Sequence, residues 1–475
     1  MLARLTSSAA VAAIVLPAGL AIAAPDRIAI GTPDDPTLEF VHGCWEGPDG
    51  NLTGVRLLMP IEPAVLDAEA RPARGVADNR VDFVFVGDGY TAAEEATYSS
   101  HVAFAASQLF VYEPFKAYEN YFRIHEIFVE SNESGVDNDP SQGISRDTAL
   151  DMSYWCNGIE RLLCVNVSKA YSFANLAPDV DQVIALANSS KYGGAGYSSS
   201  DLGTAAGGNS AAPQIAIHEL GHSLGDLADE YTYGGPSTYS GGEPGAKNVS
   251  IYDAAQMAAD ERKWHQWLGY VDTRFDGTVG TYEGGNYSAF GIYRPTNNSM
   301  MRNLNRKFNA PSAERLIRSF YIEVSPIDDH SPNGAPISAN ETVSVTPMQP
   351  IGHDLDVSWD IDGTPITSAG GMTTITPEGF GVTAGGVLTA TVVDNTDMVR
   401  SESIRANLMT ARVSWTVLPA SCPADLDGNG TLNIDDIDAF VAFFLGGDLA
   451  ADLDGNGTLN VDDVDAFVAA YLAGC

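Results

Sequence analysis

The stretch Pro213-Gln-Ile-Ala-Ile-His-Glu-Leu-Gly-His-Ser-Leu-Gly-Asp-Leu-Ala-Asp-Glu-Tyr231 has the pattern of a helix that carries two histidines. His218 and His222 are four residues apart, so both imidazoles project from one helix face, where two nitrogens can share a zinc ion. Glu219 lies between them and points about 100° around the helix, within reach of a metal-bound water, as a general base requires. The spacing therefore predicts a zinc-binding, hydrolytic helix.

The residues around this motif agree with a helix. Pro213 suits a first helical turn, and Gly225 can end the helix. The alternative interpretation is a buried amphipathic helix with two satisfied core histidines. With eight histidines in 475 residues, the motif is expected by chance in roughly one chain in a hundred, which favours zinc.

Two histidines leave zinc in need of a third protein ligand. In a continuous helix Asp229 would lie about 10 Å along the axis from His222, so the chain must turn after Gly225 for Asp229 to reach the metal. Asp229 is the preferred ligand. The alternatives, in order, are Glu230, Asp226 and a remote carboxylate such as Glu283.

The composition is strongly acidic. Aspartate and glutamate number 62 against 25 lysines and arginines, a net charge of −37, which opposes binding to nucleic acid or to an anionic membrane. A chain of 475 residues has room for three or four domains.

Residues 1–23 have the features of a signal peptide. Arg4 precedes the apolar run Ala9–Ala21, and the run ends in Ala21-Ile22-Ala23, a small-residue cleavage site. A retained membrane anchor is the alternative, but the run is short and contains Pro17. We therefore expect cleavage after Ala23 and a secreted protein.

In a secreted protein the five cysteines would be in an oxidising compartment, where disulfide bonds can form. Cys156 and Cys164 are near enough to close a small loop, and Cys422 and Cys475 bracket the end of the chain, which leaves Cys44 over. None of the five has the spacing of a structural zinc site.

The pattern of apolar and polar residues divides the chain after the signal peptide into regions. Residues 24–75 suggest a short β-rich leader. Residues 76–330 alternate expected strands (81–86, 120–129, 181–188) with helices (92–110 and the histidine helix), which predicts an α/β catalytic domain. The glycine-rich residues 192–208 favour a β-edge or a substrate-cleft loop over a phosphate loop. Residues 340–418 alternate as in a small, immunoglobulin-like β-sandwich.

A repeat near the C-terminus has the pattern of two calcium loops. The segment 425–436 recurs 27 residues later as 452–463. Oxygen ligands at loop positions 1, 3, 5, 7, 9 and 12, with glycine at 6, suit a seven-coordinate calcium ion. The expected ligands are Asp425, Asp427, Asn429, Thr431, Asn433 and Asp436, and then Asp452, Asp454, Asn456, Thr458, Asn460 and Asp463. Solvated acidic turns are the alternative.

Aspartate at position 12, and a single helix after each loop, give residues 422–475 a resemblance to dockerin modules rather than to complete EF-hands. In that family the module docks a secreted enzyme onto a cohesin partner. The resemblance therefore implies two calcium ions and a cohesin-like docking partner.

The motif continues into Asp229-Glu230-Tyr231, and with that continuation the chain resembles the IgA-peptidase-like zinc peptidases, family M64. Other pieces of the family pattern follow in order over about residues 76–325, among them Glu113-Pro114-Phe115, Tyr293-Arg294-Pro295 and Asn298–Arg302. The resemblance implies a zincin-like, metzincin-related fold. It also implies one zinc ion on His218, His222 and Asp229, Glu219 as base, and a methionine turn at Met300 or Met301.

Asp226 stands where that family more often has glycine, and Gly225 lies one place earlier, so the resemblance does not determine the turn geometry. The family's immunoglobulin substrate does not carry over either. An oxyanion donor is also needed. The candidates are Tyr293, which is the first choice, and Tyr231, Tyr287 and Arg294.

The leading hypothesis is a secreted zinc endopeptidase, acting on protein or peptide substrates, with a calcium-stabilised docking tail. One alternative is a non-catalytic adhesion or scaffold protein that retains the fold; the intact Glu219 opposes it. The other is a dockerin-bearing glycoside hydrolase, for which no convincing pair of carboxylates is visible.

Overall fold

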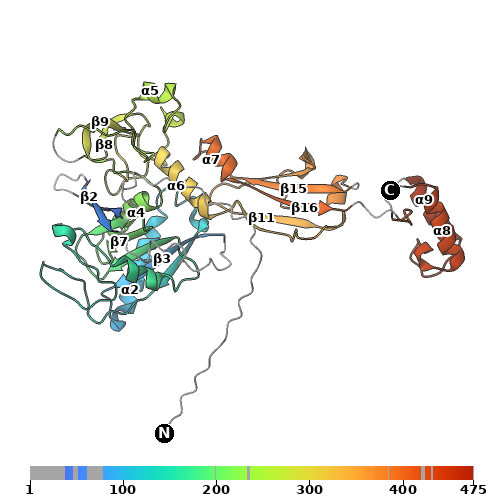
Figure 1. Cartoon of the computed structure of the whole chain (residues 1–475), viewed down its shortest axis with the longest axis horizontal. Helices are drawn as coiled ribbons and strands as arrows, with labels where there is room; N and C mark the ends of the chain where they lie inside the picture. The colour runs from blue at the N-terminus through green and yellow to red at the C-terminus, as the bar shows by residue number, and fades with distance from the viewer. Residues whose placement is uncertain are drawn as a thin grey trace, which may run out of the picture.

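A computed structural model of the chain describes residues 38–46, 52–60, 79–197, 199–232, 236–382, 385–418, 423–428 and 432–473 (Figure 1). The expected signal peptide lies outside these ranges, as do Cys422, Cys475, Asn429 and Thr431. Among the helices in these ranges, none is both long enough and apolar enough to cross a membrane.

The largest sheet in the described residues has seven strands. Their order is β2 (Leu52–Pro60), β1 (Leu38–Glu46), β6 (Gly194–Tyr197), β7 (Leu202–Ala206), β5 (Gln182–Ala187), β3 (Val81–Asp88) and β4 (Phe122–Ile127). The strands β4, β3, β5 and β7 are parallel to one another, whereas β6 is antiparallel to β7, and β1 is antiparallel to both β6 and β2. The edge formed by β6, β1 and β2 is therefore antiparallel.

Helices cover both faces of this sheet. Every residue of β3 is buried; Phe83 and Phe85 pack with residues of α2 (Glu95–Leu109) and α4 (Ala212–Ser223) on one face. Val84 and Val86 pack with α3 (Val167–Ala174) on the other. A strand buried on both faces reads as a continuous apolar run, which is why the sequence predicts it readily.

Most expected elements of this domain lie where the sequence predicts them. Thr91 and Glu94 form a capping box, and a 3-10 turn at Ala92–Glu94 leads into α2. The strands expected at 120–129 and 181–188 are β4 and β5. The glycine-rich residues 192–208 form β6 and β7.

The leader differs from the expectation in one respect. Its two strands, β1 and β2, pair along their whole length, from Leu38 opposite Pro60 to Glu46 opposite Leu52. Because β1 also pairs with β6, β1 and β2 extend the sheet that packs against the histidine helix rather than forming a region of their own.

The second half of the catalytic domain is less regular. It contains α5 (Ala254–Ala259), the hairpin of β8 (Tyr282–Gly285) and β9 (Ser288–Arg294), and α6 (Ala310–Glu323). Asn309 caps the start of α6: its side chain accepts a hydrogen bond from the backbone N–H of Ser312, and Pro311 occupies the first turn.

Two small antiparallel sheets follow. The first consists of β10 (Ile327–His330), β11 (Val343–Pro347) and β14 (Thr374–Ile375); the second consists of β13 (Thr364–Pro365), β12 (Asp356–Ile361), β15 (Gly386–Val393) and β16 (Thr410–Val417), with α7 (Glu402–Asn407) before β16. Trp359 and Trp415 stack in their common core, with ring centroids 5.8 Å apart. This core is continuous with that of the catalytic domain, and β10 starts the unit before the expected residue 340.

The last two helices, α8 (Ile434–Gly446) and α9 (Val461–Ala473), share a small core of their own (Figure 1). The rings of Phe440 and Phe467 stack 4.3 Å apart, and each residue occupies the same position in its repeat.

A buried carboxylate joins the expected catalytic domain (residues 76–330) to the unit formed by the two small sheets β10–β16, which we call the β unit. Asp394, at the end of β15, accepts hydrogen bonds from the hydroxyls of Tyr118 at 2.6 Å and Tyr321 at 2.7 Å, and from Nε2 of His353 at 3.0 Å. Burial alone would raise the pKa of Asp394, but His353 and the tyrosines lower it below its usual range.

Asp394→Ala is expected to lower the free energy of unfolding by at least about 3 kcal/mol, because it removes the acceptor shared by two buried tyrosine hydroxyls and the half-buried ring of His353. Chemical denaturation measures the change. Asp397→Ala, which removes the exposed partner of Arg274, is the matched control, with an expected change below about 1 kcal/mol. Equal losses in the two variants would contradict the joining role of Asp394.

Candidate metal centre

Helix α4 carries His218, Glu219 and His222, all buried. The helix ends at Ser223, and the chain then reverses: the backbone N–H of Leu227 donates to the carbonyl of Gly221 at 2.9 Å. The reversal brings Asp229 back beside the two imidazoles, as a carboxylate ligand requires.

The reversal depends on Asp226 as much as on Gly225. The positive φ of 48° falls on Asp226, a residue type that adopts this conformation more readily than most. Arg315 of α6 pairs with the carboxylate of Asp226, and its Nε donates to the carbonyl of Gly225 at 3.1 Å. Gly225 is needed for space instead, since a Cβ there would lie 2.7 Å from the carbonyl oxygen of Gly221.

Three ligand atoms meet at one point. Oδ1 of Asp229 lies 3.1 Å from Nε2 of His218 and 3.2 Å from Nε2 of His222, and the two nitrogens are 3.2 Å apart. Tetrahedral zinc with ligands at about 2.0–2.1 Å holds neighbouring ligand atoms roughly 3.3 Å apart. The triangle therefore has the size that zinc requires.

The hydrogen bonds on the far side of each ring determine which nitrogen carries the proton. Nδ1 of His218 donates to the carbonyl of Met300 at 2.9 Å, and Nδ1 of His222 donates to that of Leu227 at 2.6 Å. A carbonyl can only accept, so each neutral ring carries its proton on Nδ1 and presents a lone pair at Nε2. Two lone pairs and a carboxylate oxygen thus face one another, an arrangement that a cation stabilises.

The charges of the centre are consistent with this arrangement. Burial alone would raise the pKa of Asp229, but His222, His218 and His42 hold it well below its usual range, so Asp229 stays ionised. Burial raises the pKa of Glu219 to about 8; His218 opposes this shift and Asp229 adds to it. The pKa values of the two buried carboxyl groups thus shift in opposite directions, that of Asp229 toward the ionised form and that of Glu219 toward the protonated form.

Glu230 supports the turn from behind. It accepts hydrogen bonds from Asn248, Asn309 and Ser299, and its backbone N–H donates to the carbonyl of Met301. Burial raises the pKa of its carboxyl group, against these hydrogen bonds. Glu230 therefore faces away from the three ligand atoms.

The two methionines lie beneath the helix, as the family resemblance implies. Both are fully buried, and Met301 packs against Gly221 so closely that a Cβ on the glycine would lie 2.3 Å from Sδ. Met300 contributes its carbonyl, which orients His218.

Two residues of the centre were missed by the sequence analysis. On β1, the ring of His42 stacks on that of His222 with centroids 4.3 Å apart, and Nδ1 of His42 is 3.6 Å from Oδ2 of Asp229. Sγ of Cys44 donates to Oε1 of Glu219 at 3.4 Å. The only sign of this in the sequence was that His42 and Cys44 are two residues apart in a region expected to be β-rich. In a strand this spacing places both side chains on the same face.

The tyrosine that reaches the centre is Tyr287, whose hydroxyl donates to Oδ2 of Asp229. Tyr231 lies alongside, with its ring 6.4 Å from that of His218. The preferred oxyanion donor, Tyr293, lies on β9, where its backbone pairs with Ser250. Arg294 donates to the carbonyls of Glu283 and Gly284, and so holds the β8–β9 hairpin.

The carboxylates of the two C-terminal loops also gather. Asp425, Asp427 and Asp436 form one group, and Asp452, Asp454 and Asp463 form the other. In the second loop Asn456 and Gly457 donate backbone N–H groups to Asp452, and Asn460 donates its own to Asp463. The loop is therefore already curved around its carboxylates.

The cysteines agree in part with the expectation. Cys156 and Cys164 form a disulfide, whereas Cys44 is a buried thiol. The expected pairing of Cys422 with Cys475 lies outside the described residues.

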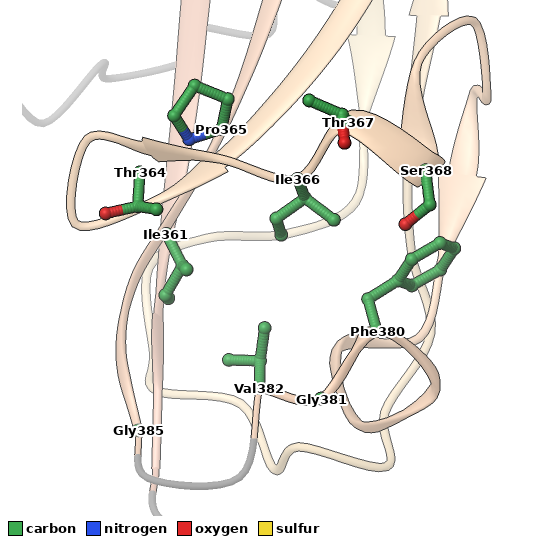
Figure 2. A pocket seen from close by; sticks show the side chains of 10 residues that line it. All are labelled: Ile361, Thr364, Pro365, Ile366, Thr367, Ser368, Phe380, Gly381, Val382 and Gly385. Atoms are coloured by element: carbon green, nitrogen blue, oxygen red, sulfur yellow. The ribbon is translucent and has the colours of Figure 1, made fainter.

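A pocket of about 450 Å³ lies elsewhere, on the β unit (Figure 2). It lies between Ile361, Ile366, Phe380 and Val382, and none of its described lining residues is ionisable. The described residues of this pocket therefore offer no acid, base or charged ligand for catalysis.

Comparison with known proteins identifies the catalytic domain. The model of a family described as IgA Peptidase M64 matches residues 73–274 and 270–320, which together make up just over half of the chain. No curated protein matches the chain. The family resemblance drawn from the sequence is thereby confirmed for the peptidase, whereas the dockerin resemblance stays a prediction. Membership implies a metallopeptidase that acts on protein or peptide substrates. The chain belongs to the IgA peptidase M64 family.

Proposed function

We propose that the protein is a secreted zinc endopeptidase in which His218, His222 and Asp229 hold one zinc ion and Glu219 is the general base. One observation carries the proposal: two imidazole lone pairs and an ionised carboxylate face one point, 3.1–3.2 Å from one another. In a fully buried position this arrangement is unfavourable without a cation. Two histidines and a carboxylate are also a ligand set that catalytic zinc uses.

A zinc ion held by these three residues would supply a Lewis acid for the attacking water and the scissile carbonyl. Glu219, on the same helix, then takes the proton from the water and passes it to the leaving amine. Its Oε2 is buried and has no hydrogen-bond partner in the described residues, so the carboxyl group has an acceptor to offer. The hydroxyl of Tyr287 reaches Asp229, which makes Tyr287 a better candidate oxyanion donor than Tyr293, provided that its O–H turns from Asp229 to the substrate.

Secretion rests on the signal-peptide pattern of residues 1–23. The disulfide between Cys156 and Cys164 supports it, because such bonds persist in oxidising compartments.

We further propose that residues 422–475 bind two calcium ions and dock the enzyme onto a cohesin-like partner. The gathered carboxylates of each loop support calcium. Three pairs of repeat-equivalent apolar residues are exposed, and they support docking: Ile434 and Val461, Val441 and Val468, Leu445 and Leu472. Leu445 and Leu472 are 81 % and 79 % exposed, and both helices thus present the same apolar positions that a docking partner would cover.

Zinc binding separates the roles of the two adjacent carboxylates. Asp229→Asn is expected to weaken zinc binding at least about a hundredfold, and Glu230→Gln about tenfold or less, because only Asp229 has an oxygen at the ligand triangle. Each change removes one charge at nearly constant size. Competition with a chelating indicator measures the affinities, and the reverse ranking would exchange the two roles.

Glu219→Gln is expected to keep one zinc per chain and lose at least about a hundredfold in peptide hydrolysis, as loss of a general base predicts. Metal analysis and product sequencing from a peptide library give the two readouts. Glu341→Gln, an exposed glutamate between β10 and β11, is the control and should match the unchanged protein. Full turnover by Glu219→Gln would exclude Glu219 as the base.

Calcium is expected to raise the melting temperature of the C-terminal module by at least about 10 °C, because ions bound only by the folded loops stabilise them. The calorimetric transition of the zinc domain should not move. The measurement is a calcium titration of the calcium-depleted, zinc-loaded chain in the Glu219→Gln background, with Asp436→Asn/Asp463→Asn as control. A calcium-independent module would remove this part of the proposal.

A further inference from the structure

The proposed centre is closed to solvent. His218 and Glu219 are 0 % exposed, and His222 and Asp229 are 1 % exposed. Hydrolysis requires that a water molecule and a peptide bond both reach the metal and the base. Something that now covers the centre must therefore move before the protein can act as a peptidase.

Strand β1 provides the cover. His42 lies flat on His222 and approaches Asp229, while Cys44 donates to Glu219. Both side chains are buried. Two residues of one strand thus touch two of the proposed zinc ligands and the base.

The alternation of β1 explains how it does so. Val41 is fully buried in the core on the far side of the sheet, and Gly43 lies against Leu162, where a Cβ would come within 2.3 Å of Cδ1. His42 lies between these two residues and Cys44 follows Gly43. Because side chains alternate along a strand, His42 and Cys44 face the other side of the sheet, where the proposed centre lies. One face of β1 therefore packs against the core of the sheet, and the other face packs against the proposed metal centre.

The backbone of β1 is paired with the side of β6 that lies next to Glu219, the proposed general base. β1 pairs antiparallel with β6 through Val41 opposite Tyr197 and His42 opposite Gly196. Gly196 borders Glu219 so closely that a Cβ there would lie 2.4 Å from Oε2. Any extended peptide paired with β6 at this point runs directly past the general base and the ligand triangle.

Oε2 of Glu219 is a second, independent indication. This atom is fully buried, faces Gly196, and has no hydrogen-bond partner in the described residues. Buried carboxylate oxygens normally have a donor. A polar atom aimed at the β6 edge without a partner is what a site for water and substrate requires.

We propose that β6 is the strand with which an extended peptide substrate pairs, and that β1 fills this place in the full chain and keeps the peptidase latent. The inference rests on the proposed zinc-peptidase function and adds its regulation. Displacement of the β1–β2 hairpin opens the β6 edge, frees the ligand triangle from His42 and frees Glu219 from Cys44.

The test uses the full chain loaded with one zinc ion and fluorescently labelled casein as substrate. His42→Ala/Cys44→Ala is expected to raise kcat/KM at least about tenfold, because a weakened cover increases the fraction of open enzyme. Zinc content should stay at one per chain. The rise should not depend on enzyme concentration, since the inhibitor is part of the same chain.

His330→Ala, an exposed histidine of β10, is the matched control and should leave kcat/KM unchanged. Should the double variant fail to fold, His42→Ala and Cys44→Ser are assayed separately, each with part of the expected rise. Equal or lower activity in the folded variants overturns the inference, because β1 is then a structural or catalytic part of the site.

The outcomes also separate the two proposals. A full chain that already hydrolyses casein as fast as the variants, and loses this activity in Glu219→Gln, contradicts only the latency. Zinc-loaded protein and variants that all fail to cleave casein and a peptide library contradict the proposed function itself.

Discussion

Two hydrogen bonds, from Nδ1 of His218 to the carbonyl of Met300 and from Nδ1 of His222 to that of Leu227, determine the chemistry of the centre. They leave both Nε2 atoms as acceptors, facing each other and an ionised Asp229. With both rings neutral, two lone pairs and a carboxylate oxygen face one point, an arrangement that a bound metal cation would stabilise. The methionine turn and the turn after α4 are the two backbone segments that supply these carbonyls, and their positions therefore matter more than their side chains.

The rest of the catalytic domain can be understood as support for those segments. Arg315 holds the turn at Gly225 and Asp226, and Glu230 ties the following residues to Asn248, Ser299 and Asn309. Gly221 lets Met301 approach the helix, and Gly196 of β6 leaves room for Glu219. Small residues and buried hydrogen bonds thus place one helix between the methionine turn and strand β6.

Local pattern predicted the local features. Three features were predicted in this way: the spacing of His218 and His222, the buried run of β3 and the cap at Thr91. They depend on side-chain periodicity or on hydrogen bonds between near neighbours, and both can be recognised in a sequence. His42 and Cys44 were missed because they reach the centre only through the pairing of β1 with β6, about 150 residues away along the chain. Tyr293 was preferred to Tyr287 for a similar reason, since the hairpin register decides which hydroxyl reaches Asp229. Asp226 shows the limit of a residue-type rule: the sequence assigned the turn to a glycine, whereas an aspartate paired with Arg315 adopts the positive φ.

The central claim is that His218, His222 and Asp229 bind one metal ion together. A crystal of the zinc-loaded chain, with diffraction measured on either side of the zinc absorption edge, tests it most directly. The account predicts one anomalous peak in the catalytic domain, about 2.0–2.2 Å from Nε2 of both histidines and from the nearer carboxylate oxygen of Asp229. A peak held by other residues, or no peak at the two imidazoles in zinc-saturated protein, would contradict it.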